Sequence, residues 1–255
     1  MLIVAASMEQ ELIGLRRALL EIEDTTGVHP PVEFKVLGVG PERSGSAMAT
    51  LLDARNADLE GVLVLGVAGG VDPVLETGDL LLANRYSLQN GAAQGFGQSI
   101  RPDPQMLQSA QQAALDLSMP VCNGGSLTVD HLVAGPDERD ELRAQYQVDS
   151  VNMEDYRVAH SAQKAGVPFL SARVVLDTAN QQLPGYLPGL ARSPYKVLTN
   201  VVLLPWRIPT MLNLKRQLQL GQMVITNFGL AYLKVAGVIG NGGEADGNKS
   251  PGAPY

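Results

Sequence analysis

Three acidic residues of the chain lie next to apolar segments of the kind that form buried strands. Glu11 closely follows the apolar residues 2–6. Glu154 lies near the later strands, and Asp177 directly follows the apolar run at residues 169–176. Ligands of open α/β sheets gather at the carboxyl ends of the strands, so we expect these carboxyl groups to meet there. Because paired carboxyl groups can serve as general acid and general base, the residues alone predict an α/β enzyme that works with carboxylates.

Glycines at further strand ends would let a ligand approach the main chain. Gly38 lies at the end of the second predicted strand and Gly40 directly follows it, and Gly69 and Gly70 end the third. A glycine has no β-carbon, so the backbone at these positions is open to close contact. The pair Gly69 and Gly70 could also form a simple turn.

The acidic residues have structural interpretations as well. Glu11 could be a solvated carboxylate near a helix amino terminus, where the helix dipole favours a negative charge. Glu154 and Asp177 could cap the elements that they adjoin. Position in the sequence does not decide between these interpretations and the catalytic one.

Several other kinds of site are excluded by the spacing of residues. No G-x-G-x-x-G follows the first predicted strand, so a dinucleotide fingerprint is absent, and no G-x-S-x-G marks a serine nucleophile. His29, His131 and His160 are scattered, and Cys122 is the only cysteine, so no zinc-type spacing exists. We therefore expect neither a metal nor an organic cofactor.

The composition is that of a globular protein with one large domain. The chain has 255 residues, of which 45% are hydrophobic, and its net charge is -7. Its apolar stretches fall short of the ~18 residues of a membrane span, and its start lacks the basic region of a signal peptide. A single cysteine suits a reducing compartment. We expect a cytoplasmic protein without a nucleic acid partner.

Apolar segments alternate with helical periodicity up to Asp177. Strands that are apolar on both faces and alternate with helices predict an α/β sheet covered on both sides. The predicted strands are residues 2–6, 32–39, 61–70, 78–83 and 169–176, with an extended stretch at 121–133. The predicted helices are residues 8–20, 41–55, 106–117 and 153–165, and one more that begins at Pro136.

The pattern changes after Asp177. Residues 181–194 are predicted to form a loop, and residues 240–255, which lack periodicity, a disordered tail. Helical stretches are predicted at residues 196–204, 208–220 and 222–238. We assign residues 1–239 to a single domain, with residues 196–239 as a helical extension.

Charge is divided unevenly along the chain. No Asp or Glu occurs from Thr178 to Gly243, whereas six Lys or Arg residues do. The apolar residues 201–206, which include the only tryptophan, could pack in a core or a subunit interface. Alternatively, residues 192–234 could rest on the inner face of an anionic membrane, since each basic side chain near such a surface contributes about 1 kcal/mol.

Four motifs occur in an order that is found in one enzyme family. Residues 6–11 (ASMEQE) are similar to A-M-E-x-E, and residues 67–73 (VAGGVDP), with GD at 78–79, to S-A-G-G-x-x-P…G-D. Residues 151–154 (VNME) are similar to V-E-M-E, and residues 173–177 (RVVLD) to R-x-x-S-D. Over roughly residues 1–180 the chain thus resembles the purine nucleosidase branch of the nucleoside phosphorylase superfamily. The resemblance implies a three-layer α/β/α sandwich around a mixed, mostly parallel sheet, and a homo-oligomer.

The resemblance also implies that the acids cleave an N-ribosidic bond. Asp177 would protonate or hydrogen-bond the purine N7, which requires a raised pKa in a closed site. Glu11 would activate water, and Glu154 would accept hydrogen bonds from the ribose hydroxyls. Further substrate-binding residues implied by the resemblance are Met153 against the sugar, Leu132 and Val133 at the base, and Ala68 and Gly69 of the glycine motif.

Two positions depart from the family pattern. Val67 replaces the serine of S-A-G-G, and Leu176 replaces the serine before Asp177, so the aspartate loses an expected orienting partner. Keeping Glu11 while losing a phosphate-binding hydroxyl favours hydrolysis over phosphorolysis. Arg43 argues the other way if it binds phosphate, but it could equally be a surface arginine in the first turn of a helix.

A second resemblance concerns the region after the last predicted strand. Residues 177–184 (DTANQQLP), with the extended region behind them and G-x-A-G-G at 66–70, resemble the hopanoid-associated branch of the superfamily. This implies adenosylhopane, a lipid-tailed adenine nucleoside, as the substrate, with an open apolar mouth beside the sugar. The alternatives are a phosphorylase with phosphate as co-substrate, a methylthioadenosine/S-adenosylhomocysteine nucleosidase, and a non-catalytic nucleoside-binding sensor.

Overall fold

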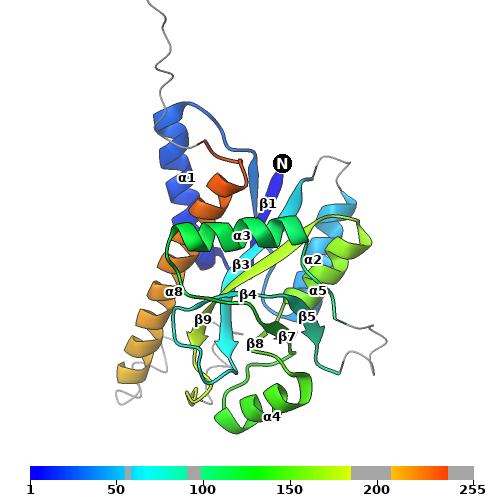
Figure 1. Ribbon diagram of the computed structural model, residues 1–255, viewed down its shortest axis with the longest axis vertical. Coiled ribbons are helices and arrows are strands. Elements are labelled where there is room, and N and C mark those ends of the chain that lie inside the picture. Colours follow the sequence, from blue (N-terminus) through cyan, green and yellow to red (C-terminus); the bar gives the residue numbers. More distant parts are fainter. Residues whose placement is uncertain (55–58, 91–98, 185–207, 241–255) are drawn as a thin grey trace, which may run out of the picture.

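The computed structural model describes residues 1–54, 59–90, 99–184 and 208–240, and these form an α/β sandwich (Figure 1). The strands are β1 (Leu2–Ala6), β2 (Val32–Val36), β3 (Gly61–Gly70), β4 (Leu80–Leu82), β5 (Arg85–Leu88), β6 (Val121–Cys122), β7 (Gly125–Thr128), β8 (Ser150–Asn152) and β9 (Phe169–Asp177). The helices are the 3-10 turn η1 (Glu9–Glu11), α1 (Ile13–Thr26), α2 (Pro41–Asp53), α3 (Pro104–Asp116), α4 (Pro136–Tyr146), α5 (Asp155–Lys164) and α8 (Ile208–Val235).

The strands form one nine-stranded mixed sheet with β3 at its centre. The strand order is β5-β7-β8-β3-β9-β4-β6, and β1 pairs with both β3 and β2. All pairings are parallel except those of β3 with β8 and of β4 with β9. The predicted class, a mostly parallel α/β sandwich with a carboxyl-terminal helix, is confirmed.

One edge of β3 is shared by two strands that leave a gap between them. β1 pairs with this edge as far as Val64, and β8 pairs with it at Gly69 and Gly70. In the described part of the chain no strand pairs with this edge between Val64 and Gly69, and we call this opening the sheet window. Because β1 is parallel and β8 antiparallel to β3, both point their carboxyl ends toward the window. The residues that follow them, Glu11 and Glu154, are thereby brought to the same place.

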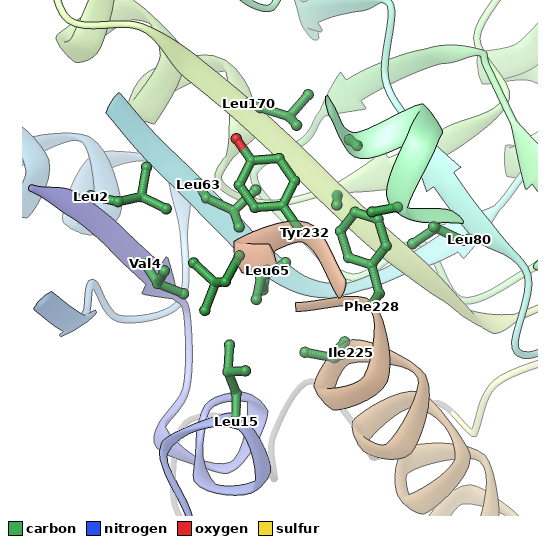
Figure 2. Close-up of a cluster of buried hydrophobic side chains, with 14 of the residues drawn as sticks. Leu2, Val4, Leu15, Leu63, Leu65, Leu80, Leu170, Ile225, Phe228 and Tyr232 are labelled. Carbon is green, nitrogen blue, oxygen red and sulfur yellow. The ribbon is translucent and has the colours of Figure 1, made fainter. Parts of the chain in front are cut away.

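Alternate residues of the central strands pack into separate cores on the two faces of the sheet. Leu63 and Leu65 belong to the core that α1, α3 and α8 cover, whereas Val62 belongs to the core under α2 and α5. Figure 2 shows Phe228 and Tyr232 of α8 among the strand side chains of the first core. Since each large apolar side chain contributes roughly 1.5–3 kcal/mol when buried, the contacts of α8 stabilise this face of the sheet.

α8 also makes polar contacts with the segments that carry the predicted site. The Gln217 amide donates to Thr77 Oγ1 at 3.2 Å and to Gln181 Oε1 at 2.9 Å. Gln222 donates to the carbonyl of Gln10, next to Glu11, at 3.1 Å. The amino-terminal turns of α8 extend beyond the sheet (Figure 1).

The structure differs most from the sequence prediction in α8. Two helices were predicted at residues 208–220 and 222–238, but the structure has the single helix Ile208–Val235. Gly221 does not interrupt it because the missing side chain lets the helix lie against the sheet. A β-carbon at Gly221 would lie 3.3 Å from Cγ1 of Val67.

The other differences are smaller. The helix predicted at residues 8–20 is divided into η1 and α1, and the strand predicted at 32–39 ends at Val36. The extended stretch 121–133 contains the short strands β6 and β7, while β5 and β8 were not predicted.

Some predictions fall outside the described residues. These concern the helix at residues 196–204, the apolar segment 201–206, residues 185–194 of the predicted loop and residues 241–255 of the predicted tail. Among the helices that the structure does describe, none combines the length and the hydropathy needed to cross a bilayer.

Candidate active site

Glu11 lies at the sheet window with a buried carboxylate. The turn η1 directs it back toward β3, and only 2% of the residue is exposed. Its Oε2 accepts the Met8 amide at 2.9 Å, and its Oε1 accepts the Val67 amide at 3.1 Å, so Glu11 bonds to β3 where no strand does. Burial raises the pKa of Glu11, and the nearby Arg173 opposes this rise. Glu11 is therefore not a solvated surface carboxylate.

Arg173 of β9 is the buried cation of the window. Its Nε and Nη2 donate to Oδ1 of Asp155 at 3.0 and 2.5 Å, and Nη2 lies 3.5 Å from Oε2 of Glu154. Burial disfavours the charge, but Asp155, Glu154 and Glu11 outweigh that effect and raise the pKa of Arg173. Three carboxyl groups thus converge on one permanent cation.

Glu154 occupies the position before α5, but its side chain does not cap the helix. Its Oε1 accepts the amide of Gly40 at 3.1 Å, which joins the loop after β2 to the site. Gly40 has φ +102°, a conformation that side-chain-bearing residues rarely adopt. The backbone conformation therefore favours glycine at this position, while the contact with Glu154 is made by the main-chain N–H.

Gly66 allows the charged groups to approach β3. A β-carbon there would lie 2.5 Å from Nη1 of Arg173 and 2.8 Å from Oε1 of Glu11. Both distances are shorter than a van der Waals contact. Glu11 and Arg173 could therefore not keep these positions beside any larger residue.

Asp177, the last residue of β9, is directed by a β-bulge. The register of β9 with β3 shifts so that Val175 pairs with Ala68 and Asp177 pairs with Gly69, which leaves Leu176 as the additional residue. A β-carbon on Gly69 would lie 3.3 Å from Oδ2 of Asp177. The bulge thus turns the carboxyl group of Asp177 toward the end of β3.

Arg139 of α4 is the charged partner of Asp177. Arg139 is fully buried, and its Nη2 donates to Oδ2 of Asp177 in an ion pair. Burial raises the pKa of Asp177, and Arg139 opposes this rise. The partner that seemed lost with the serine at Leu176 is therefore supplied by a different element.

A cavity of about 50 Å³ brings together most of the predicted substrate-binding residues. It is lined by Gly69, Val129, His131, Leu132, Val133, Val151, Asn152, Met153 and Asp177. Of the predicted residues, five lie here although they are far apart in the sequence, and Ala68 is buried in β3 beside them. The fold therefore gathers the residues that the resemblance assigns to base and sugar.

Two predicted features lie at the margin of this arrangement. Arg43 is exposed and its side chain lies against Gly38, where a β-carbon would come within 2.5 Å of Arg43 Nε. This position agrees with the surface-arginine interpretation. The main-chain amide of Val67 donates to Glu11, and its carbonyl accepts a hydrogen bond from Arg173. The side chain of Val67 lies near Gly221 of α8.

Three charged residues of the site were not predicted from the sequence. Arg173 belongs to the motif at residues 173–177, which implies no role for it, and no motif includes Asp155 or Arg139. Asp155 follows Glu154 directly, and that acidic pair was a usable signal. Arg139 lies in PDERDELR, which is typical of a solvent-exposed helix, so nothing in the sequence marked it. Within the described ranges, no group of three or more His, Cys, Asp or Glu is placed to hold a metal ion.

The sheet, the sheet window and its buried acids define an enzyme of the nucleosidase and phosphorylase type, which cleaves N-glycosidic bonds of purine nucleosides. The profile of the Phosphorylase superfamily matches residues 27–187, and the chain belongs to this family. The resemblance seen in the four motifs is thereby confirmed.

Individual proteins that are similar to this chain include 5'-methylthioadenosine/S-adenosylhomocysteine nucleosidases. A 5'-methylthioadenosine/S-adenosylhomocysteine nucleosidase of Geobacillus thermodenitrificans is 27% identical over 201 residues, which are 70% of this chain and 84% of that protein. The enzyme of that name from Staphylococcus epidermidis is 25% identical over 200 residues, covering 69% and 86% of the two chains.

Solved structures agree in fold. The 5'-methylthioadenosine/S-adenosylhomocysteine nucleosidase of Neisseria meningitidis, in complex with methylthio-immucillin-A, has a TM-score of 0.69 at 19% identity and covers 91% of this chain and 98% of its own. The futalosine hydrolase of Helicobacter pylori has a TM-score of 0.65 at 17% identity, covering 89% and 96%. At these identities the likeness establishes the fold alone.

Proposed function

We propose that the chain hydrolyses the N-glycosidic bond of an adenine nucleoside. The observation that carries the proposal is the placement of two buried carboxyl groups at one end of β3. Glu11 approaches the strand at Gly66, and Asp177 approaches it at Gly69. A base on water and an acid on the leaving group are the two groups that hydrolysis of a glycosidic bond needs.

The reaction follows from these roles. Glu11 removes a proton from water, and the water oxygen bonds to the anomeric carbon of the ribose. The bond from that carbon to the purine nitrogen breaks, and its electron pair passes to the base. Asp177 delivers its proton to N7, so the purine leaves as a neutral molecule. Glu154 accepts hydrogen bonds from the ribose hydroxyls, and solvent returns the proton from Glu11 to Asp177.

Electrostatics support water over phosphate as the nucleophile. The sheet window holds the carboxyl groups of Glu11, Glu154 and Asp155 around the single guanidinium of Arg173. A phosphate dianion entering this window would meet more negative than positive charge. Arg43, the residue that favoured phosphorolysis, has its side chain against Gly38.

The first prediction concerns the nucleophile. Purified protein should release adenine from methylthioadenosine, S-adenosylhomocysteine or adenosine in phosphate-free buffer, and phosphate should not change the rate. In ¹⁸O-water, mass spectrometry should find one labelled oxygen in the ribose product and no ribose 1-phosphate. An absolute requirement for phosphate would show a phosphorylase instead. Binding of nucleosides without any turnover would indicate the sensor.

An additional proposal concerns the substrate's 5′ substituent and the membrane. Leu212, Leu220 and Met223 of α8 are 51%, 38% and 58% exposed, and their spacing places them on one side of the helix. Lys215 and Arg216 are exposed between them. An apolar and basic surface of this kind suits an anionic lipid surface. It supports adenosylhopane as the substrate and a peripheral position at the inner membrane face.

Vesicle binding tests this second proposal. We expect the protein to co-sediment with vesicles of phosphatidylglycerol and phosphatidylcholine, and the double variant K215E/R216E to lose this binding, since each basic residue contributes about 1 kcal/mol. The variant K234E changes the same kind of charge at the other end of α8 and should bind like the wild type. Equal binding of all three proteins, or binding of none, would contradict a lipid surface on α8. The homo-oligomer and the absence of a nucleic acid partner stay predictions.

A further inference from the structure

Arg139 is an unusual residue for the helix that carries it. α4 has the sequence PDERDELRAQY, in which Arg139 is 0% exposed and Arg143, one turn later, is exposed. A buried guanidinium is costly unless its charge and its N–H groups are matched. Its burial therefore calls for a specific partner, and Asp177 is that partner.

The guanidinium of Arg139 joins the two walls of the cavity. It donates to the carbonyl of Thr178, directly after Asp177, and to the carbonyl of Val133 at 3.1 Å. Val133 and Asp177 both line the cavity. Because the planar guanidinium presents its donors in a fixed geometry, these contacts hold the Asp177 carboxyl group in one orientation.

The contacts also distinguish the two carboxyl oxygens of Asp177. Throughout the described residues, the hydrogen bond and the ion pair of this side chain are both made by Oδ2. Arginine has five N–H donors, no acceptor and a permanent charge, so an oxygen that faces it is kept as an acceptor. A proton on the carboxyl group is consequently confined to Oδ1.

We propose that Arg139 is a positioning residue that holds Oδ2 of Asp177, so that the acidic proton is carried on Oδ1 and presented to the leaving purine. The proposal rests on the proposed function, because it needs Asp177 to act as the acid. When Oδ1 gives its proton to N7, the carboxylate that forms is neutralised by a guanidinium already in contact with it. Arg139 thus stabilises the transition state through Asp177 without touching the substrate.

The charge of Arg139 predicts a direction for the pH profile. Asp177 must be protonated to act, so activity falls as pH rises through its pKa. Burial raises that pKa and Arg139 restrains the rise. Without the cation the pKa should rise further, and the alkaline limb of the kcat profile should move to higher pH. The other titratable side chain of the cavity lining, His131, bonds to Asp130 and Glu138 and is unchanged in a variant of Arg139. A shift of this limb in such a variant therefore reports on Asp177.

The test compares Arg139→Met with Arg143→Met, a surface control on the same helix. For R139M we expect kcat to fall about 10- to 100-fold, which is part of the rate enhancement that a general acid contributes. KM should change little, and the alkaline limb of the kcat profile should move to higher pH. R143M should match the wild type. Arg139→Lys keeps the positive charge but not the planar guanidinium with its fixed donors. This variant should recover part of kcat, and its alkaline limb should lie at the same pH as in the wild type. If R139M does not fold, Arg139→Gln, which is also uncharged, should show the same fall in kcat and the same shift of the alkaline limb.

A double variant decides whether Arg139 acts through Asp177. In the D177N background, the change R139M should cause no further loss of kcat, because the group that it positions is already gone. An equal loss in both backgrounds, or an unmoved alkaline limb in the single variant, would overturn the proposal. If the wild type itself releases no purine, the proposed function fails. If the wild type is active and R139M behaves like R143M, only the role of Arg139 fails.

Discussion

Replacing Asp177 by asparagine should lower kcat by about 10²–10⁴-fold, the contribution of a general acid. Asparagine has the size of aspartate and can still accept a hydrogen bond from Arg139, but its amide cannot protonate the leaving purine. The alkaline limb of the pH profile, which reports the raised pKa of Asp177, should vanish with the acid. Steady-state kinetics between pH 5 and 10 would measure both effects.

The fold should survive this substitution with lower stability. D177N leaves the buried guanidinium of Arg139 without its opposite charge. Removing a partner from a buried ion pair costs about 3–5 kcal/mol, and less where the acceptor is kept. Circular dichroism and thermal melting would measure this cost, with Asp72→Asn, the partner of the exposed Arg143, as the control. Full activity of D177N would remove Asp177 from the mechanism.

Replacing Glu11 by glutamine should have a comparable effect on kcat, because no base remains to activate water. Both carboxylate oxygens of Glu11 accept main-chain amides, so one N–H group of β3 or of the preceding turn would also lose its acceptor. The base works only when ionised, and burial raises its pKa above the ordinary 4.5. Wild-type activity should therefore decline on the acid side at a pH above that of an ordinary glutamate.

The matched control for this variant is Glu9→Gln. Glu9 lies in the same turn, but it is exposed and pairs with Arg16. E9Q should keep both the rate and the acid limb, whereas E11Q should lose the rate and show no acid limb. If nucleoside binding were lost in E11Q with kcat unchanged, Glu11 would be a binding residue and not the base.

The parts of the fold that could be predicted are those with strong local signals. β3 was predicted to the residue because a long apolar run ends in two glycines. β5 and β8 were missed because their sequences, RYSL and SVN, are short and partly polar. Both form strands by pairing with β7, and β8 also pairs with β3. The prediction divided α8 at Gly221 because glycine has a low helix propensity. In the structure the helix continues through Gly221, which lies close to Val67, a contact that no sequence pattern shows.

The site divides in the same way. Glu11, Glu154 and Asp177 could be proposed because each follows a recognisable strand. Arg139 could not, since its neighbours in α4 are polar and exposed and only the bulge at Leu176 brings Asp177 to it. A partner that depends on tertiary placement has no local signature.

The core that α8 and β1 share has a consequence for the biosynthesis of the protein. Leu2 and Val4 share one core with Phe228 and Tyr232, so β1 can complete this core only after α8, far behind it in the chain, has been synthesised. Until Val235 has been synthesised, the part of this sheet face that α8 covers stays open to chaperones or to other chains. The same helix holds Gln10 beside Glu11, so nascent chains should be inactive and activity should begin only once α8 has docked.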